Sequence, residues 1–576
     1  MFRRILSLLN GTERQKAAML FVGILTNSVV EILGLAVIIP VIGLIVEPDI
    51  IESNPNFYRA YEFCQHWGVN TYNDFLLVLC VGLILAFAFK ALYGIGISTI
   101  QSRFSFSVAH RMSGQMWAYH FSQSLEKLRS SESGKILTEI NAWPIHFAQA
   151  FMIGGLVIIS ECSVILFISG GLFLYNPFVL LSIFTMVACG WYIIRTITKK
   201  KLEHYSQLRK IIEPRTNTLI NNAIRGCLEL ITFRATDAVK KNYLNQQHTV
   251  FRVNSNSTVF HFIPAKLYEV LAVGAISVTI IITVIQGTPN QEFVELLTLM
   301  TVGAYRIMPS LSRINGSIMQ MRGQAHILQA IERSVLYNKS NRITTIDRVN
   351  LGEQITIELE GMELGYQGKK DPVLQGLNHT FLPGKIHAII GPSGSGKTTL
   401  VNAMLGLHPL RKGQLKISCD QSHEWVLSTS LSVQEWLLRC GYLSQEPFLF
   451  QGTLKENLTF QAPDLVLDEQ RIHHIAKQLD LHSFLGEDLL EFPLAESGNN
   501  LSGGQKQRIG LLRALQSKRQ ILMLDEATSA LDSSMRDQVL QLLRNEADSG
   551  CNVIIVTHDE LLAKACDSIL NLQEAG

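Results

Sequence analysis

The chain has 576 residues, of which 47% are hydrophobic, with a mean hydropathy of +0.20 and a formal net charge of +2. It is too long for one domain and too apolar for an ordinary soluble protein, and its charge balance gives no indication of a nucleic-acid partner. The cysteines, from Cys64 to Cys566, show no metal or redox spacing, which is typical of reduced thiols in a chain that faces the cytosol. No cleavage site of small residues follows the basic start "MFRRILSLLNGTERQK", so we expect no removable signal peptide.

Long apolar runs fill the N-terminal half of the chain. A helix needs about 20 mostly apolar residues to cross the hydrocarbon core, and helices satisfy the backbone there. We therefore predict an α-helical transmembrane domain at 1–330. Its six transmembrane helices are expected at 17–46, 75–98, 148–175, 178–197, 259–286 and 293–314.

Lys and Arg residues concentrate in two long segments between these helices, 99–147 and 198–258, whereas the loops 47–74 and 287–292 carry almost none. Since positive residues stay on the cytosolic side, the long segments and both chain ends are predicted to be cytosolic. We read the long segments as membrane helices that continue past the bilayer. The external segment 55–68 is predicted to be a short amphipathic helix at the headgroups.

The composition changes after about residue 330. A polar linker, 331–353, leads into 354–576, where short β-type runs such as "KIHAII" and "NVIIVTH" alternate with helical stretches. This alternation is typical of an α/β domain with a mainly parallel sheet.

The segment "GPSGSGKTTL", 391–400, follows an apolar strand and opens a helix, the context in which G-x-x-x-x-G-K-[ST] binds phosphates. Glycines let backbone N–H groups approach the phosphates, and the helix N-terminus adds a favourable dipole. Lys397 is expected to reach the β- and γ-phosphates, and Thr398 to bind Mg²⁺. The other predicted nucleotide-binding residues of this P-loop are Gly391, Ser393, Gly394, Ser395, Gly396 and Thr399.

A second strand, "ILMLDE", ends in two acids. Asp525 is predicted to hold the Mg²⁺ ion, and Glu526 to polarise the attacking water, because phosphoryl transfer depends on positioning and charge. Between the two motifs lies a glycine-rich helix start, "LSGGQKQR", at 501–508.

With "LSGGQ" in this order, 354–576 resembles the nucleotide-binding domain of ATP-binding-cassette (ABC) proteins. The resemblance implies ATP hydrolysis with ATP and Mg²⁺ as cofactors, and it assigns further roles. Tyr366 in "LGYQG" would stack on adenine, Gln445 in "GYLSQEPFLF" would link Mg²⁺ to the membrane half, and His558 in "VIIVTHD" would be the switch histidine. Glu526, His558 and Gln445 form the catalytic set, with Gln445 also a metal ligand. Ser502, Gly503, Gly504, Gln505 and Asp532, the last in "SALD", would complete the nucleotide site.

In this family the P-loop of one cassette faces the signature of another, and this chain has one of each. Two copies are therefore expected, with a homodimer as the simplest assembly and a heterodimer as the alternative. One departure is the stretch "FPLAESGNN", where the family's T-x-V-G-E-x-G pattern has Leu494 and Ala495 in place of Val-Gly.

Six spans ahead of one cassette resemble the ABC exporter architecture, so an ATP-driven exporter or flippase of the cell (inner) membrane is the favoured prediction. An ATP-gated channel or regulator, and a cassette ATPase without transport, are the alternatives. The intact Glu526 and His558 favour turnover.

Charged residues interrupt the apolar runs, at a cost of at least about 2.5 kcal/mol each. Lys90, Lys266 and Arg306 are predicted to face a water-filled cavity that attracts an anionic group. The alternative is internal ion pairing with acids of the same runs, Glu31, Glu161 and Glu269, while Arg313 is expected to reach the inner interface.

The membrane half also resembles, in patches over 20–320, the bacterial lipid-linked oligosaccharide flippases of protein N-glycosylation. The resemblance rests on "VVEILGLAVIIPVI", "AFKALY", "VIISECSVIL" and "AYRIMPSLSRI". It implies an amphipathic, anionic lipid-linked oligosaccharide as substrate. A peptide or hydrophobic small molecule is the alternative.

Overall fold

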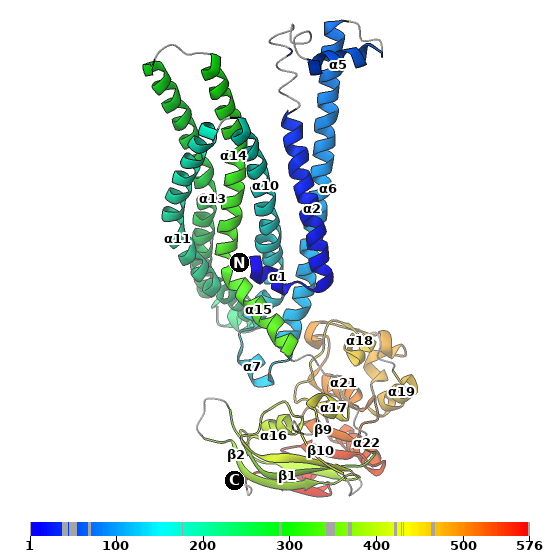
Figure 1. Cartoon of the computed structure of the whole chain (residues 1–576). Helices are drawn as coiled ribbons and strands as arrows, with labels where there is room; N and C mark the ends of the chain where they lie inside the picture. The colour runs from blue at the N-terminus through cyan, green and yellow to red at the C-terminus, as the bar shows by residue number, and fades with distance from the viewer. Residues whose placement is uncertain are drawn as a thin grey trace. The chain divides into compact units, whose positions relative to one another are not determined.

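The structure is a computed structural model (Figure 1). The residues it describes are 2–36, 44, 55–66, 71–175, 177–286, 291–340, 352–366, 371–419, 423–427, 429, 431–461 and 467–573. The chain divides into two compact units, which are Met1–Gln123 with Ser130–Arg342, and Ser124–Arg129 with Ile343–Gly576. The short helix α7 (Leu125–Ser130) falls almost wholly in the second unit.

The first unit is helical. Its longest helices run alongside one another in Figure 1 and contact each other in pairs, α2 with α6 and α10, α10 with α14, and α13 with α11 and α14. The long helices are α2 (Gly11–Ala36), α6 (Tyr72–Phe121), α10 (Gly154–Tyr175), α11 (Pro177–Arg225), α13 (Thr236–Gln286) and α14 (Gln291–Gly323). The shorter ones are α1 (Phe2–Leu8), α5 (Pro55–Gln65), α8 (Ser133–Leu137), α9 (Trp143–Phe147), α12 (Cys227–Thr232) and α15 (Ala325–Ser340).

Each of the six predicted spans lies wholly or partly in one of the long helices, although 37–43 and 45–46 of the first fall outside the described residues. Within the described part of the chain, three continuous helical stretches are long and apolar enough to cross a membrane: Gly11–Gly34, Tyr72–Phe121 and Ser133–Gly171. The total of six spans therefore stays a prediction. The helix predicted at 55–68 corresponds to α5 over Pro55–Gln65, and 67–68 lie outside the described residues.

Two π-helical segments, η1 (Thr138–Ala142) and η2 (Ala148–Ile153), flank α9. Between them, Trp143 and Phe147 turn into a buried core that also contains Met112 of α6 and Ile327 of α15. The wider turn of a π-helix rotates the following side chains relative to an α-helix. The sequence pattern did not predict these segments.

The second unit contains two main sheets. The first is antiparallel, in the order β2-β1-β4-β5, and consists of β1 (Ile355–Leu364), β2 (Leu374–Phe381), β4 (Lys412–Cys419) and β5 (His423–Val426). The second is parallel, in the order β11-β3-β10-β9-β6, and consists of β3 (Ile386–Ile390), β6 (Cys440–Leu443), β9 (Ile521–Asp525), β10 (Asn552–Val556) and β11 (Ser568–Asn571). The central strands β9 and β10 are buried along their whole length, as their continuous apolar runs predict.

The helices of this unit pack against these sheets or form a helical subdomain. They are α16 (Lys397–Met404), α17 (Val433–Leu437), α18 (Leu454–Thr459), α19 (Glu469–Gln478), α20 (His482–Leu485), α21 (Gly503–Leu515), α22 (Ser533–Asp548) and α23 (Glu560–Lys564). A small pair of strands, β7 (Gly452–Thr453) and β8 (Pro493–Leu494), joins α18 to the segment before α21. Parallel strands carry their carboxyl ends at one edge, and the predicted site residues follow β3, β6, β9 and β10 at that edge.

Candidate nucleotide site

The loop between β3 and α16 has the backbone of a phosphate cradle. Gly394 and Gly396 adopt φ of +82° and +94°, a region that side chains rarely adopt. A Cβ on Gly396 would also lie 2.7 Å from Val373 Cγ1. The ammonium of Lys397 folds back over the loop and donates to the carbonyls of Gly391, at 2.8 Å, and Pro392, at 2.9 Å.

The cradle has unused hydrogen-bonding capacity. The hydroxyl of Ser395 is buried and has no hydrogen-bond partner among the described residues. A phosphate oxygen in the loop is the kind of acceptor this hydroxyl lacks, and the carbonyl contacts of Lys397 are exchangeable for charge-assisted ones. The residues present therefore fit a nucleotide polyphosphate.

The metal-binding candidates meet at the end of β9. Thr398 Oγ1 donates to Asp525 Oδ2 at 3.0 Å, so a hydroxyl and a carboxylate oxygen lie together beside the cradle. Oxygen ligands of this kind suit Mg²⁺. Burial raises the pKa of Asp525 above its ordinary value, and burial likewise lowers the pKa of Lys397. Both shifts reflect the cost of holding these charges away from water.

Two of the three predicted catalytic side chains, Gln445 and His558, contact the carboxylate of the third, Glu526. Gln445 Nε2 donates to Glu526 Oε2 at 2.8 Å, and His558 Nε2 lies 2.7 Å from Glu526 Oε1. Glu526 has a φ of +53°, which is uncommon for a residue with a side chain and marks the turn that follows β9. The structure thus joins residues that are 81 and 32 positions apart in the sequence.

The sequence analysis missed Gln507, which holds the loop that follows Glu526. This buried amide donates to the carbonyl of Glu526 and to Ser529 Oγ at 2.9 Å, and it accepts from the N–H of Ala530 at 3.1 Å. The sequence "LSGGQKQR" did contain a signal for this role: Gln507 is a polar residue on the side of the helix that faces the apolar core.

The signature residues form the start of α21. Ser502 Oγ accepts from the N–H of Gln505 at 3.3 Å, while Gln505 Oε1 accepts from the N–H of Ser502 at 2.8 Å. This reciprocal cap leaves the first turn of the helix ordered and its remaining N–H groups open. A Cβ on Gly504 would lie 2.8 Å from the carbonyl of Ala530, so the position requires glycine. Gly503 meets nothing closer than 4.0 Å.

Two further predicted nucleotide-binding residues, Tyr366 and Asp532, make contacts with neighbouring residues of the same domain. The Tyr366 hydroxyl is 3.0 Å from Thr399 Oγ1, and its ring packs edge-on against His408 with 5.4 Å between centroids. Asp532 caps α22 by accepting from the N–H of Met535 at 2.8 Å. No hydrogen bond or ion pair among the described residues joins the signature to the cradle.

The structure pairs most of the intramembrane charges that were candidates for substrate binding. Arg306 of α14 forms an ion pair with Glu31 of α2, and Lys266 pairs with Glu269 at 2.8 Å on an exposed face of α13. Lys90 of α6 lines a cavity of about 200 Å³ together with Glu31, and it stacks over Phe87 at 5.0 Å.

Arg313 and Glu161 form a two-bond contact between α14 and α10, with Nε–Oε1 at 2.6 Å and Nη2–Oε2 at 3.0 Å. The internal ion-pair alternative therefore describes the arrangement of Arg306 and Lys266 in this structure. Arg313, which was expected to reach the inner interface, instead pairs with Glu161.

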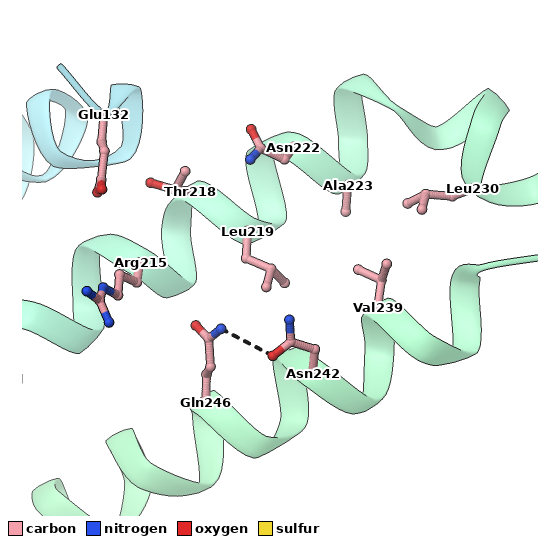
Figure 2. Close-up of a pocket in the computed structure, with 10 residues that line it drawn as sticks. All are labelled: Glu132, Arg215, Thr218, Leu219, Asn222, Ala223, Leu230, Val239, Asn242 and Gln246. Carbon is pink, nitrogen blue, oxygen red and sulfur yellow. Dashed lines mark hydrogen bonds between the residues drawn. The ribbon is translucent and has the colours of Figure 1, made fainter. Parts of the chain in front are cut away.

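A separate cavity of about 400 Å³ lies between α11 and α13, in the predicted cytosolic part (Figure 2). Asn242 and Gln246 on one wall share a hydrogen bond of 3.3 Å, and Leu219 of α11 points toward them. None of the predicted site residues lines it.

A family model described as ABC transporter matches residues 374–529. The "ATP-dependent lipid A-core flippase" of Saccharophagus degradans is 32% identical over 216 residues, covering 37% of this chain and 35% of the relative. The "Multidrug resistance-like ATP-binding protein MdlA" of Escherichia coli is 35% identical over 199 residues, covering 34% and 32%. The match thus spans about a third of the length of each relative.

A solved bacterial Atm1-family ABC exporter with ATP bound shares the fold with a TM-score of 0.75 at 17% identity, over 98% of this chain and 94% of that one.

Proposed function

We propose that this protein is an exporter driven by ATP hydrolysis. Residues 374–529 match an ABC transporter domain, which uses ATP with Mg²⁺, and the chain has the fold of an ABC exporter. The fold and the long apolar helices make it a multi-pass membrane protein with a cytoplasmic ABC domain. The observation that carries the proposal is the convergence of Gln445 and His558 on Glu526, next to the Thr398–Asp525 pair.

In the proposed reaction, Lys397 and the cradle would hold the β- and γ-phosphates, and Thr398, Asp525 and Gln445 would hold Mg²⁺. When bound, the ion supplies charge that stabilises the transferred phosphoryl group. Glu526 orients the attacking water and accepts its proton. Gln445 and His558 fix the two carboxylate oxygens, so that the proton acceptor is held in one orientation.

The test is ATP hydrolysis by the full-length protein in detergent. Because general-base catalysis contributes a factor of about 10² to 10⁴, Glu526→Gln should lower the rate at least about 100-fold while ATP binding persists. The exposed Glu560→Gln on α23 is the matched control and should hydrolyse ATP at the wild-type rate. An unchanged rate in Glu526→Gln would refute the catalytic assignment.

We further propose that two copies of the chain act together in the cell inner membrane, the signature residues Ser502 to Gln505 and Asp532 of one copy completing the nucleotide site of the other. The open N–H groups at the start of α21 support this arrangement, since they suit an anion from a second cassette. Glu526→Gln with MgATP should sediment as a stable dimer. A monomer that hydrolyses ATP at the full rate would overturn the proposal.

For the substrate, we propose an amphipathic, anionic lipid-linked molecule of the oligosaccharide type that moves outward from the inner leaflet. Support comes from the resemblance of the membrane half, from Lys90, which lines a cavity together with Glu31, and from a relative named as a flippase of lipid A-core. A relative named as multidrug resistance-like keeps a hydrophobic small molecule, or a peptide, as the second candidate.

The two substrate classes are separated by ATPase stimulation in liposomes. A polyprenyl-pyrophosphate oligosaccharide should stimulate the wild type, and Lys90→Gln should weaken the stimulation while leaving the basal rate intact. Stimulation by peptides or uncharged drugs alone would favour the second candidate. Turnover-independent ion conductance would instead indicate an ATP-gated channel.

A further inference from the structure

A groove between α2 and α6 has a different composition at its two ends. It has a volume of about 470 Å³ and is lined by Met19, Leu20, Gly23, Ile97, Ile100 and Phe104, together with the polar residues Lys16, Arg103 and Ser107. The groove lies at the predicted cytosolic ends of the spans 17–46 and 75–98. The side chains of Lys16, Arg103 and Ser107 come from residues just outside those spans.

The two cations lie at the same level because the helices are antiparallel and their register is fixed by close contacts. A Cβ on Gly23 would lie 2.9 Å from Ile97 Cδ1, and one on Gly94 would lie 3.7 Å from Asn27 Oδ1. Moving seven residues back from Gly23 reaches Lys16, and moving six forward from Ile97 reaches Arg103. At 1.5 Å per residue, both are about 10 Å from the Gly23 contact, on opposite walls of the groove.

Neither cation is neutralised by a neighbouring acid. Among the described residues, no ion pair involves Lys16 or Arg103, and both side chains are exposed. The nearest acid in the sequence, Glu13, is held by Arg111, with Nε–Oε1 and Nη2–Oε2 both at 2.7 Å. The groove therefore keeps two uncompensated positive charges above an apolar slot.

We propose that this groove binds one anionic phospholipid of the inner leaflet, with its phosphate between Lys16 and Arg103 and an acyl chain along the apolar wall. Charge complementarity supports this occupant, because the cytoplasmic leaflet is negatively charged and juxtamembrane cations attract its lipids. The hydroxyl of Ser107, which donates to the carbonyl of Phe104 at 2.7 Å, lines the same end of the groove. The site lies apart from Arg306 and Lys266 and does not depend on the identity of the transported substrate.

The test counts lipids that stay bound to the full-length protein in native mass spectrometry, after reconstitution in nanodiscs of phosphatidylcholine with phosphatidylglycerol. Each lost cation should weaken phosphatidylglycerol binding about fivefold, so Lys16→Gln with Arg103→Gln should weaken it about 30-fold. The matched control is Lys200→Gln with Lys201→Gln, which removes the same charge from α11 outside the groove and should retain the lipid.

A third variant, Ile100→Trp, keeps both charges and fills the apolar slot. It should also lose the tightly bound lipid, since the acyl chain has no room, and it keeps the proposal testable if the double variant fails to fold. Equal loss in the α11 control would show that general surface charge attracts the lipid, which would overturn the proposal. The proposal would also be overturned if the protein retained phosphatidylcholine as well as phosphatidylglycerol. The same holds if inorganic phosphate alone stabilised the protein in detergent as well as the lipid does.

Discussion

The ion pair between Arg306 and Glu31 should be worth more to stability than any surface pair, and a double-mutant cycle measures it. Their side chains are 15% and 24% exposed, and they connect α14 to α2 within predicted membrane spans. Leaving one charge without its partner at membrane depth costs about 2.5 to 3.5 kcal/mol on insertion scales. Because both side chains are partly exposed, the cost should be somewhat lower than on those scales. We expect Glu31→Gln or Arg306→Gln alone to lower the free energy of unfolding by about 2 kcal/mol.

The double variant removes both charges and leaves no unpaired one, so it should lose less than about 1 kcal/mol. The coupling energy, which is the sum of the two single losses minus the loss in the double variant, is then about 3 kcal/mol, or roughly a 100-fold change in the unfolding equilibrium. The assay is equilibrium unfolding of the full-length protein in mixed micelles with increasing sodium dodecyl sulfate, followed by circular dichroism.

The pair between Arg313 and Glu161 provides the matched comparison. Arg313 is 47% exposed, so water screens its charge, and its coupling should stay below about 1 kcal/mol despite the two-bond geometry. If the two cycles give equal couplings, or if the first gives none, then the reasoning from depth and burial is wrong.

Three further predictions concern the cassette. Gly504→Ala should destabilise the protein measurably in thermal unfolding because its Cβ would meet the Ala530 carbonyl at 2.8 Å, whereas Gly503→Ala, with 4.0 Å of space, should not. Asp532→Ala should lower stability by about 1 kcal/mol through the loss of the α22 cap, measured by the same unfolding assay. Burial raises the pKa of Asp525, so without Mg²⁺ its charge opposes folding: stability should fall as pH rises through that pKa, and Mg²⁺ affinity should weaken as pH falls through it. The measurement is stability and Mg²⁺ affinity as a function of pH in the wild type and in Asp525→Asn, and the variant should lose both pH dependences.

The cassette could be predicted in unusual detail from the sequence because its motifs follow strands. The carboxyl ends of β3, β9 and β10 meet at one edge of a parallel sheet, so Thr398 and Asp525 were expected near each other. The sequence could not show that Glu526 turns through a left-handed φ, or that Gln507 holds that turn from a neighbouring helix. Those features depend on tertiary contacts that no local pattern encodes.

The membrane half was less predictable for a physical reason. Hydropathy locates helices but carries little information on which faces meet, so the sequence left cavity charges and internal ion pairs as open alternatives. The contact between Arg306 and Glu31 needs the relative rotation of α14 and α2, and the π-helical turns around α9 alter such rotations. Depth alone could not distinguish Lys90, which lines a cavity with Glu31, from Lys266, which is exposed.

Helix α14 holds polar contacts on more than one side. Seven residues separate Arg306 from Arg313, so the two arginines lie about two turns apart on one face, against α2 and α10. Nearer its C-terminal end, Asn315 donates to the Tyr268 hydroxyl of α13 at 2.7 Å. Because Arg306 and Glu31 both lie within predicted membrane spans, a movement of α14 away from α2 must exchange this contact for another.

This requirement connects the ion pair with the proposed anionic substrate. Arg306 can bind a substrate phosphate only if that phosphate displaces the carboxylate of Glu31, so the ion pair competes with binding. Glu31→Gln removes the competitor and should lower the substrate concentration that gives half-maximal ATPase stimulation, even though it destabilises the free protein. Arg306→Gln should raise that concentration. If both variants leave it unchanged, Arg306 serves only to hold α14 against α2, and the substrate is recognised elsewhere.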